Sequence, residues 1–178
     1  FEKGTTDREL LLRAASSLDK ALASQWLDRA PDTPLASPYE ALILASIIEK
    51  ETGLAKERPM ISGVFVRRLN KGMRLQTDPT VIYGLGDQYK GNITRQHLKQ
   101  STPYNTYRID GLPPSPISIV GLDAIKAALN PASGTALYFV AKGDGSHQFS
   151  DTLKQHNRAV REYQLKRRSD YRSTPEKK

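Results

Sequence analysis

The chain has 178 residues, of which 38% are hydrophobic and 26% charged, a composition that is typical of one globular domain and excludes fibrous or largely disordered classes. Its formal net charge is +8, but residues 154–178 hold nine basic and three acidic side chains, so most of the charge lies at the C-terminal end. The absence of cysteine excludes a disulfide framework and a cysteine-ligated metal site.

A first amphipathic helix is predicted from Asp7 to about Arg29, because its apolar residues recur at spacings of three and four. Two prolines then predict a short linker over residues 30–36. We therefore expect residues 1–36 to form a helical lead-in to the rest of the domain. The apolar positions of the helix are Leu10, Leu11, Ala14, Leu18, Ala21, Leu22 and Trp26.

The second predicted helix begins with Ser37 as N-cap and Pro38 at its first position, and Glu40 completes a capping box. Residues 41–48 are apolar on nearly every face, which indicates a buried helix. The helix carries two glutamates in its last turn and is expected to end near Gly53.

Shorter elements are predicted for the rest of the chain, after a third helix from about Lys56 to Asn70. The fold class is therefore α+β, mainly helical with a small antiparallel sheet. We expect one catalytic domain over residues 1–168, its motifs within 37–168, and a disordered basic tail over 169–178 that carries no chemistry. The remaining elements are a short capped helix at 94–100, a helix within 119–130, a hairpin of 137–140 with 147–149, and a final helix at 151–168.

Two carboxylates close together at the end of a buried helix need an explanation, because burying an ionised carboxylate is costly. Helical spacing places Glu51 on the apolar face with Ile47 and Ile48, whereas Glu49 lies on a more polar face. Burial and the helix dipole both favour the protonated form, which a glycosidase acid requires. The alternative is a structural ion pair of one glutamate with Lys50, Lys56 or Arg58.

The segment Ala45–Thr52 resembles the catalytic segment of the endolytic murein transglycosylases, the MltG or YceG-like family. Further segments match this family in order and together cover about residues 38–165. One departure is Ser115, where the family commonly has glycine. The matching segments are Glu57-Arg58, Val64-Phe65, Arg68-Leu69, residues 72–84, 104–107, 111–114 and 137–141, His147, Phe149 and His156-Asn157.

The resemblance implies a lysozyme-like catalytic helix with Glu51 as the single catalytic acid and base, and Glu49 as the second candidate. The implied reaction cleaves the β-1,4 bond between N-acetylmuramic acid and N-acetylglucosamine and leaves a 1,6-anhydro end, which would terminate nascent glycan strands. It needs no cofactor or metal. His147 and His156 are too far apart for a metal site and are expected to support the core together with Asn157.

Polar and aromatic side chains in two segments are candidates for binding a sugar. Residues 76–83 are expected to form a short loop, in which Asp78-Pro79 also fits a helix start. In residues 104–107 the tyrosines either grip a pyranose ring or are buried with satisfied hydroxyls. The predicted substrate-binding residues are Gln76, Thr77, Asp78, Tyr83, Tyr104, Asn105, Thr106 and Tyr107.

Three alternatives remain open: a muramidase that uses water with Asp78 or Glu57 as base, a basic nucleic-acid-binding module, and a peptidoglycan-binding domain without turnover. The concentration of basic residues at the C-terminus disfavours nucleic acid. The resemblance also implies the periplasmic face of a bacterial inner membrane, reached by an N-terminal anchor and a small LysM-like domain before Phe1. Penicillin-binding peptidoglycan synthases are the implied protein partners.

Overall fold

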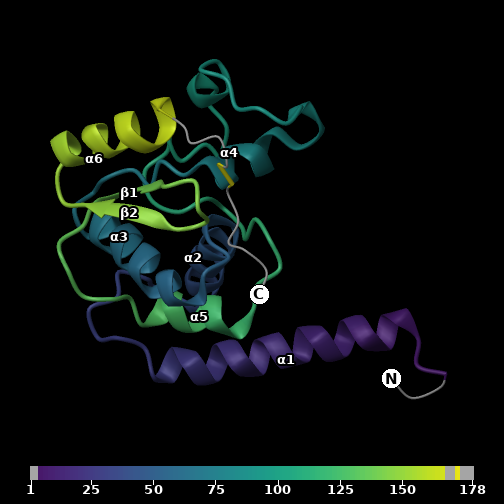
Figure 1. Cartoon of the computed structure of the whole chain (residues 1–178). Helices are drawn as coiled ribbons and strands as arrows, with labels where there is room; N and C mark the ends of the chain where they lie inside the picture. Colours follow the sequence, from purple (N-terminus) through teal and green to yellow (C-terminus); the bar gives the residue numbers. More distant parts are fainter. Residues whose placement is uncertain (1–3, 167–170, 173–178) are drawn as a thin grey trace.

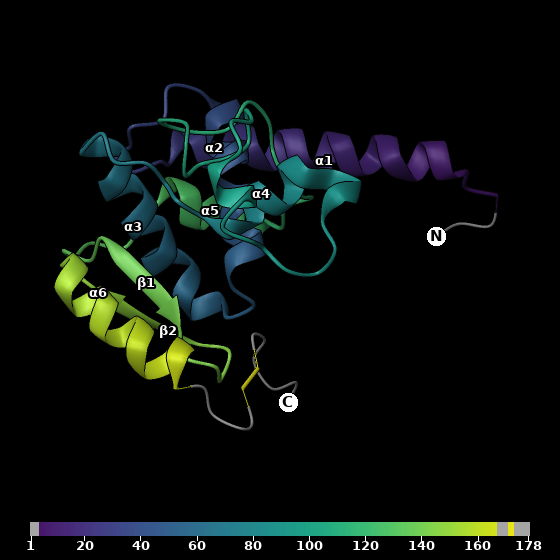
Figure 2. The same ribbon diagram turned by 90° about the horizontal axis from the view of Figure 1, so that it is seen from above.

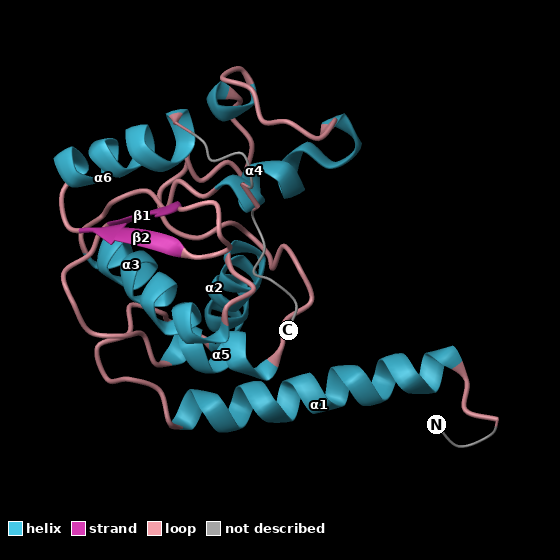
Figure 3. Cartoon of the chain, viewed as in Figure 1, coloured by secondary structure: helices cyan, strands magenta, loops and turns pink. Residues whose placement is uncertain are grey.

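A computed structural model of the chain describes residues 4–166, 171 and 172. Three helices form the centre, α2 (Pro38–Glu51), α3 (Arg58–Asn70) and α5 (Leu122–Leu129), and α1 (Asp7–Leu27) runs beneath them (Figure 1). A two-stranded antiparallel sheet, β1 (Tyr138–Ala141) with β2 (His147–Ser150), lies between α3 and α6 (Leu153–Val160) (Figures 1 and 2). The predicted α+β class is confirmed by this arrangement of helices around one small sheet (Figure 3).

The helix α1, Asp7–Leu27, begins at Thr6, which forms a capping box with Glu9. Its C-terminal half packs on the core through Leu18, Leu22 and Trp26. Its N-terminal half extends beyond the body of the molecule (Figure 1). The predicted helix is confirmed, and it ends two residues earlier than expected.

The helix α2, Pro38–Glu51, is the centre of the core, because seven of its eight residues from 41 to 48 are buried and only Leu42 is partly exposed. Ser37 accepts a hydrogen bond from the backbone N–H of Glu40, as predicted. The Glu40 carboxylate, however, accepts from Ala36 N at 2.7 Å, because the chain folds back one residue before the cap. Only half of the predicted capping box is therefore present.

The third predicted helix is divided in two, a 3-10 turn at Ala55–Glu57 and the helix α3 at Arg58–Asn70. α3 packs on α5, Leu122–Leu129, and on α2. Aliphatic and aromatic side chains of these helices make the core that holds the end of α2 in place. Its fully buried large members include Leu44, Ile47, Ile48, Ile61, Phe65, Ile125 and Leu129.

The predicted hairpin is confirmed, with β1 at Tyr138–Ala141 and β2 at His147–Ser150. Phe139 of β1 meets Phe65 of α3 edge to face, with ring centroids 5.6 Å apart. α6, Leu153–Val160, covers the other side and continues as a single π turn, Arg161–Leu165. The predicted final helix is thus shorter, and its last two residues, 167 and 168, lie outside the described residues.

Between α3 and α5 the chain is mostly irregular. The helix α4, Asp78–Leu85, replaces the loop predicted for residues 76–83, and its N-cap is Thr77 rather than Asp78. The predicted helix at 94–100 is reduced to a 3-10 turn, His97–Lys99, and another 3-10 turn follows α4 at Gly86–Gln88. None of the helices within residues 4–166 is both long enough and apolar enough to cross a bilayer.

Candidate active site

A cleft of about 670 Å³ opens where the C-terminal end of α2 meets the hairpin, α6 and the loop before α4. Glu51 lies in this cleft, and Glu49 does not line it. The cleft has a mixed polar and aromatic lining, which suits a sugar better than a purely apolar ligand. Its polar and aromatic lining residues include Glu51, Arg68, Gln76, Thr77, Asp78, Tyr107, Tyr138, His147, His156, Asn157, Gln164 and Tyr171.

Glu51 is the last residue of α2, and the apolar core holds its side chain at the cleft. The Thr77 hydroxyl donates a hydrogen bond to its carboxyl group. Burial raises the pKa of Glu51 to about 7, although the Thr77 hydrogen bond lowers it, and the negative charge of Asp78 adds a smaller upward contribution. A substantial fraction of Glu51 therefore carries its proton at neutral pH.

The loop that carries Gln76 and Thr77 is held in place by Thr106, which is fully buried. Gln76 N donates to the Thr106 carbonyl at 3.1 Å, and Thr77 N donates to the Thr106 hydroxyl at 3.0 Å. Gln76 has a φ of 53°, a left-handed conformation that is unfavourable for a residue with a side chain. These hydrogen bonds offset that strain and aim Gln76 and Thr77 at the cleft.

Arg68 of α3 connects this loop to the hairpin. Its guanidinium donates to the carbonyls of Arg74 at 2.8 Å and Leu137 at 3.1 Å, and also to the side-chain oxygen of Gln76. It also lies over the Tyr138 ring, 5.4 Å from the centroid. Since Arg68 occupies the oxygen of the Gln76 amide, the group that Gln76 offers to a ligand is its NH₂.

Asp78 lies beside Glu51 and accepts a hydrogen bond from the Tyr107 hydroxyl at 2.7 Å. Burial raises the pKa of Tyr107, and the neighbouring Asp78 charge raises it further. Tyr107 therefore remains protonated and continues to donate to Asp78. Five of the predicted site residues, Glu51, Gln76, Thr77, Asp78 and Tyr107, are thus brought together in one cleft.

Two other predicted substrate-binding residues are corrected by the structure. Asn105 and Thr106 are 1% and 0% exposed, so a direct sugar contact is not possible for them. The Asn105 amide donates to three backbone carbonyls between residues 97 and 100, and Thr106 binds Thr77 and Thr80. Both residues shape the loop from behind.

Tyr83 and Tyr104 lie together outside the cleft, with ring centroids 4.9 Å apart. The Tyr104 hydroxyl is 2.6 Å from the Ser115 hydroxyl, which is the position where the sequence departs from the family pattern. The structure therefore gives Ser115 a role in fixing this loop. Neither Tyr83 nor Tyr104 lines the cleft that contains Glu51.

The structural ion pair that the sequence allows for one of the two glutamates is formed by Glu49. Its carboxylate lies 3.1 Å from the Arg58 guanidinium and accepts from Gly121 N at 3.0 Å. Arg58 also lies 3.7 Å from Asp123 on α5. Glu49 thus connects three segments of the fold, and the two neighbouring glutamates have different surroundings.

His147, His156 and Asn157 are expected to support the core together, but in the structure the two histidines contact different partners. All three line the cleft, but His147 binds Glu57, with Nδ1 2.8 Å from the carboxylate and its backbone N–H donating at 3.1 Å. His156 instead stacks on Tyr138 with ring centroids 5.2 Å apart. Among the described residues, no three or more His, Asp or Glu side chains form a group that could hold a metal ion.

Sequence reasoning missed four polar side chains that line the cleft: Arg68, Tyr138, Gln164 and Tyr171. The sequence held a signal for Arg68, because it interrupts the apolar stripe of α3. In the structure its side chain is only 6% exposed. Tyr171 lies in the segment predicted as a disordered tail without chemistry. Of residues 169–178 the structure describes only Tyr171 and Arg172, and Tyr171 lines the cleft. That this segment carries no chemistry stays a prediction, and its other residues lie outside the described residues.

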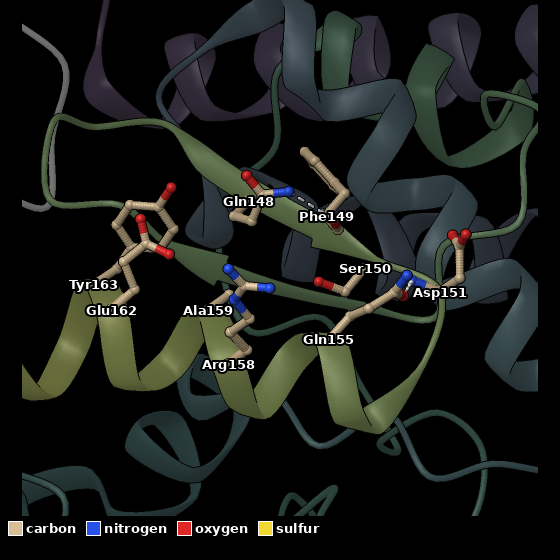
Figure 4. Close-up of a pocket in the computed structure, with 9 residues that line it drawn as sticks. All are labelled: Gln148, Phe149, Ser150, Asp151, Gln155, Arg158, Ala159, Glu162 and Tyr163. Atoms are coloured by element: carbon tan, nitrogen blue, oxygen red, sulfur yellow. Dashed lines mark hydrogen bonds between the residues drawn. The ribbon is translucent and has the colours of Figure 1, made fainter.

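A second, smaller hollow of about 270 Å³ lies between β2 and α6 (Figure 4). Its side chains include the exposed Arg158 of α6 and Glu162 of the π turn that follows it, and Figure 4 shows both on the side toward β2. It does not include Glu51, the glutamate whose pKa is raised by burial. We therefore take the larger cleft as the candidate active site.

The fold and this cleft define a class that the comparisons with known proteins identify. A profile of the YceG-like family matches residues 1–162, and the chain belongs to this family. Two relatives named endolytic murein transglycosylase are similar to it. That of Bacillus subtilis (strain 168) is 43% identical over 127 residues, 71% of this chain and 35% of the relative. That of Streptococcus pneumoniae serotype 2 (strain D39 / NCTC 7466) is 30% identical over 168 residues, 92% of this chain and 30% of the relative.

A crystal structure of a YceG-like protein from Listeria monocytogenes has a similar fold, with a TM-score of 0.63 and 48% sequence identity. The alignment covers 68% of this chain and 39% of the Listeria chain. The chain thus spans about a third of the length of the relatives that it matches.

Proposed function

We propose that this chain is the catalytic part of an endolytic peptidoglycan transglycosylase that cleaves the β-1,4 bond between N-acetylmuramic acid and N-acetylglucosamine. The observation that carries the proposal is Glu51, a carboxyl group with a pKa of about 7 in a polar cleft. A general acid is most effective when its pKa lies near the operating pH. The names of the relatives support the same substrate class.

In the proposed reaction Glu51 gives its proton to the glycosidic oxygen as the bond from C1 to that oxygen breaks. The C6 hydroxyl of the muramic acid then attacks C1, and its proton returns to the Glu51 carboxylate. The products are a 1,6-anhydro end and a free C4 hydroxyl, and no water is consumed. One carboxyl group therefore serves both steps.

The neighbours of Glu51 support these steps. The Thr77 hydroxyl stabilises the Glu51 carboxylate between the two proton transfers. The Asp78 carboxylate, oriented by Tyr107, places negative charge near the positive charge that develops on the sugar ring. The NH₂ group of Gln76 is oriented to bind an oxygen of the substrate.

The second candidate is a muramidase in which Asp78 activates water, and the proximity of Asp78 to Glu51 favours it. Glu57 is unsuitable as that base because it is buried and bound to His147. Mass spectrometry of the muropeptide products separates the two reactions, since an anhydro end is one water lighter than a reducing end. Anhydro ends support the transglycosylase, and reducing ends alone would contradict it.

We further propose that the whole protein terminates nascent glycan strands at the periplasmic face of the inner membrane, with peptidoglycan synthases as partners. The support is the family membership and the names of the relatives. Co-purification from membranes with the full-length protein as bait tests this, and recovery without any synthase would count against the partnership.

A further inference from the structure

Tyr171 and Arg172 lie at the hairpin turn, and the Tyr171 side chain lines the cleft. Arg172 N donates to the Gly143 carbonyl at 2.8 Å, and Arg172 pairs with Asp144 in a parallel bridge. Figures 1 and 2 both show this short yellow segment beside the turn. Tyr171 lines the same cleft as Glu51, although it lies beyond the residues 1–162 that match the family profile.

Gly143 permits this contact. It has a φ of +88°, and the Tyr171 ring lies where a Cβ at position 143 would be. Any larger residue at 143 would therefore displace the ring. The turn itself is held by Asp144, which accepts from the Ser146 N–H at 2.9 Å and from its hydroxyl at 2.6 Å.

Gln164 fixes the other end of the ring. Its amide nitrogen lies 3.0 Å from the Tyr171 hydroxyl and donates to the Ala141 carbonyl at 2.7 Å. Two connections, one to the turn and one to the π segment after α6, thus orient a partly exposed tyrosine at the cleft. Such an oriented ring costs little conformational entropy when a ligand binds.

We propose that Tyr171 is a binding residue for the glycan strand, offering its ring to the apolar face of a sugar. The inference rests on the proposed function, because it assumes a glycan in the cleft. The alternative is that Tyr171 only clamps the turn. A clamp would affect stability, whereas a binding residue also affects affinity for the strand.

The test measures the affinity of peptide-free glycan strands in the Glu51→Gln background, where the strands are not cut. Tyr171→Leu keeps an apolar contact but loses the ring, and should weaken binding roughly two- to tenfold. Tyr171→Phe keeps the ring and should bind within about twofold of the parent. Circular dichroism melts of each variant exclude unfolding.

A second pair of variants moves the ring without changing it. Gly143→Ala should displace Tyr171 and weaken binding as Tyr171→Leu does. Gly91→Ala is the matched control, because its φ of +93° imposes similar strain and nothing lies within 4 Å of its Cβ position. It should leave binding unchanged.

If Tyr171→Leu and Gly143→Ala bind strands as tightly as the parent, Tyr171 is not a binding residue, and the proposed function still stands. If the parent binds no glycan at all, both proposals are overturned. Strand binding by the Glu51→Gln parent therefore distinguishes failure of the Tyr171 proposal from failure of the proposed function.

Discussion

At the residue scale, Glu49 and Glu51 lie two positions apart on one helix and have opposite surroundings. Glu49 is paired with Arg58 and with the Gly121 N–H, so its charge is compensated. Burial raises the pKa of Glu51 to about 7 and the neighbouring Asp78 charge adds to this, although the Thr77 hydroxyl lowers it. This difference supports Glu51 as the proposed acid.

Glu51→Gln should fold normally and lose activity roughly 10²- to 10⁴-fold, because an amide cannot deliver the proton. Glu49→Gln should keep most of its turnover. Release of anhydro-muropeptides by each variant checks this, with circular dichroism melts as a control. A dead Glu49→Gln beside an active Glu51→Gln would reverse the assignment.

The pH dependence follows from the raised pKa of Glu51. Activity should fall as pH rises through about 7, because the proton that the first step needs is lost. Thr77→Val removes a hydrogen bond that lowers this pKa, so the alkaline limb should move to higher pH. Thr77→Ser keeps the hydroxyl and should keep the limb in place. A limb that does not move in Thr77→Val would contradict the role of this hydrogen bond.

The same ionisation affects stability. The pKa of Glu51 is higher in the folded chain, about 7, than the ordinary glutamate value of 4.5, so the folded state binds the proton more tightly. The resulting stabilisation is complete below pH 4.5 and is lost as pH rises through 7. Urea unfolding of wild type and Glu51→Gln from pH 4.5 to 8 should show the wild type losing up to about 3 kcal/mol relative to the variant. This prediction is refuted if the free energies of unfolding of wild type and Glu51→Gln change in parallel with pH.

Arg67 and Arg68 offer a matched comparison on α3. Each guanidinium donates to two backbone carbonyls, Arg67 to Ala132 and Ala136, and Arg68 to Arg74 and Leu137. Either change to Lys should lower the free energy of unfolding by about 1–3 kcal/mol.

Of these two, only Arg68 also holds Gln76, so Arg68→Lys should reduce kcat/KM beyond any loss seen in Arg67→Lys. The measurement is turnover at a temperature where both variants are fully folded. Equal turnover in the two variants would show that the connection to Gln76 is unimportant for the reaction.

At the scale of elements, α2 could be predicted from sequence because its signals are local: an N-cap serine, a proline and a continuous apolar run. α4 was missed for a physical reason. Its N-cap, Thr77, makes no side-chain capping bond within the helix and instead donates to Glu51, a residue 26 positions earlier. A local pattern does not reveal such a contact.

The candidate site, like the helices, could be predicted only in part from the sequence. Glu51 was predicted from the family resemblance and residues 76–78 from their polar side chains, and the cleft brings them together. Asn105 and Thr106 looked equally suitable for binding sugar, but their polar atoms are used by backbone groups that only the folded chain brings near. Tyr171 gave no sequence signal, since its position depends on the contact with Gly143.

Close packing of α3 against the loop before β1 gives a further prediction. A Cβ on Gly63 would overlap the Ala132 carbonyl oxygen, and the loop cannot retreat easily because Ala132 N donates to the Pro59 carbonyl at 2.8 Å. Gly63→Ala should therefore lower the free energy of unfolding by about 1–3 kcal/mol, despite the better helix propensity of alanine.

Ser62→Ala on the same helix is the control for Gly63→Ala. The Ser62 hydroxyl is buried and has no hydrogen-bond partner among the described residues, so its removal should be neutral or stabilising. Thermal melts of both variants make the comparison. A Gly63→Ala chain as stable as wild type would show that the two segments can separate.

At the scale of the whole molecule, a helical core holds the end of α2 in one place while the hairpin, α6 and the loop before α4 build the cleft around it. The positive charge lies mainly at the C-terminal end of the sequence. The chain spans about a third of the length of its relatives.

In the proposed reaction Glu51 cleaves glycan strands without using water. Incubation of the chain with purified peptidoglycan in H₂¹⁸O, followed by mass spectrometry of the products, tests this directly. We expect 1,6-anhydro ends that contain no ¹⁸O, and their absence in Glu51→Gln. Reducing ends that carry ¹⁸O, formed by the wild type and lost in Asp78→Asn, would contradict it and identify a hydrolase.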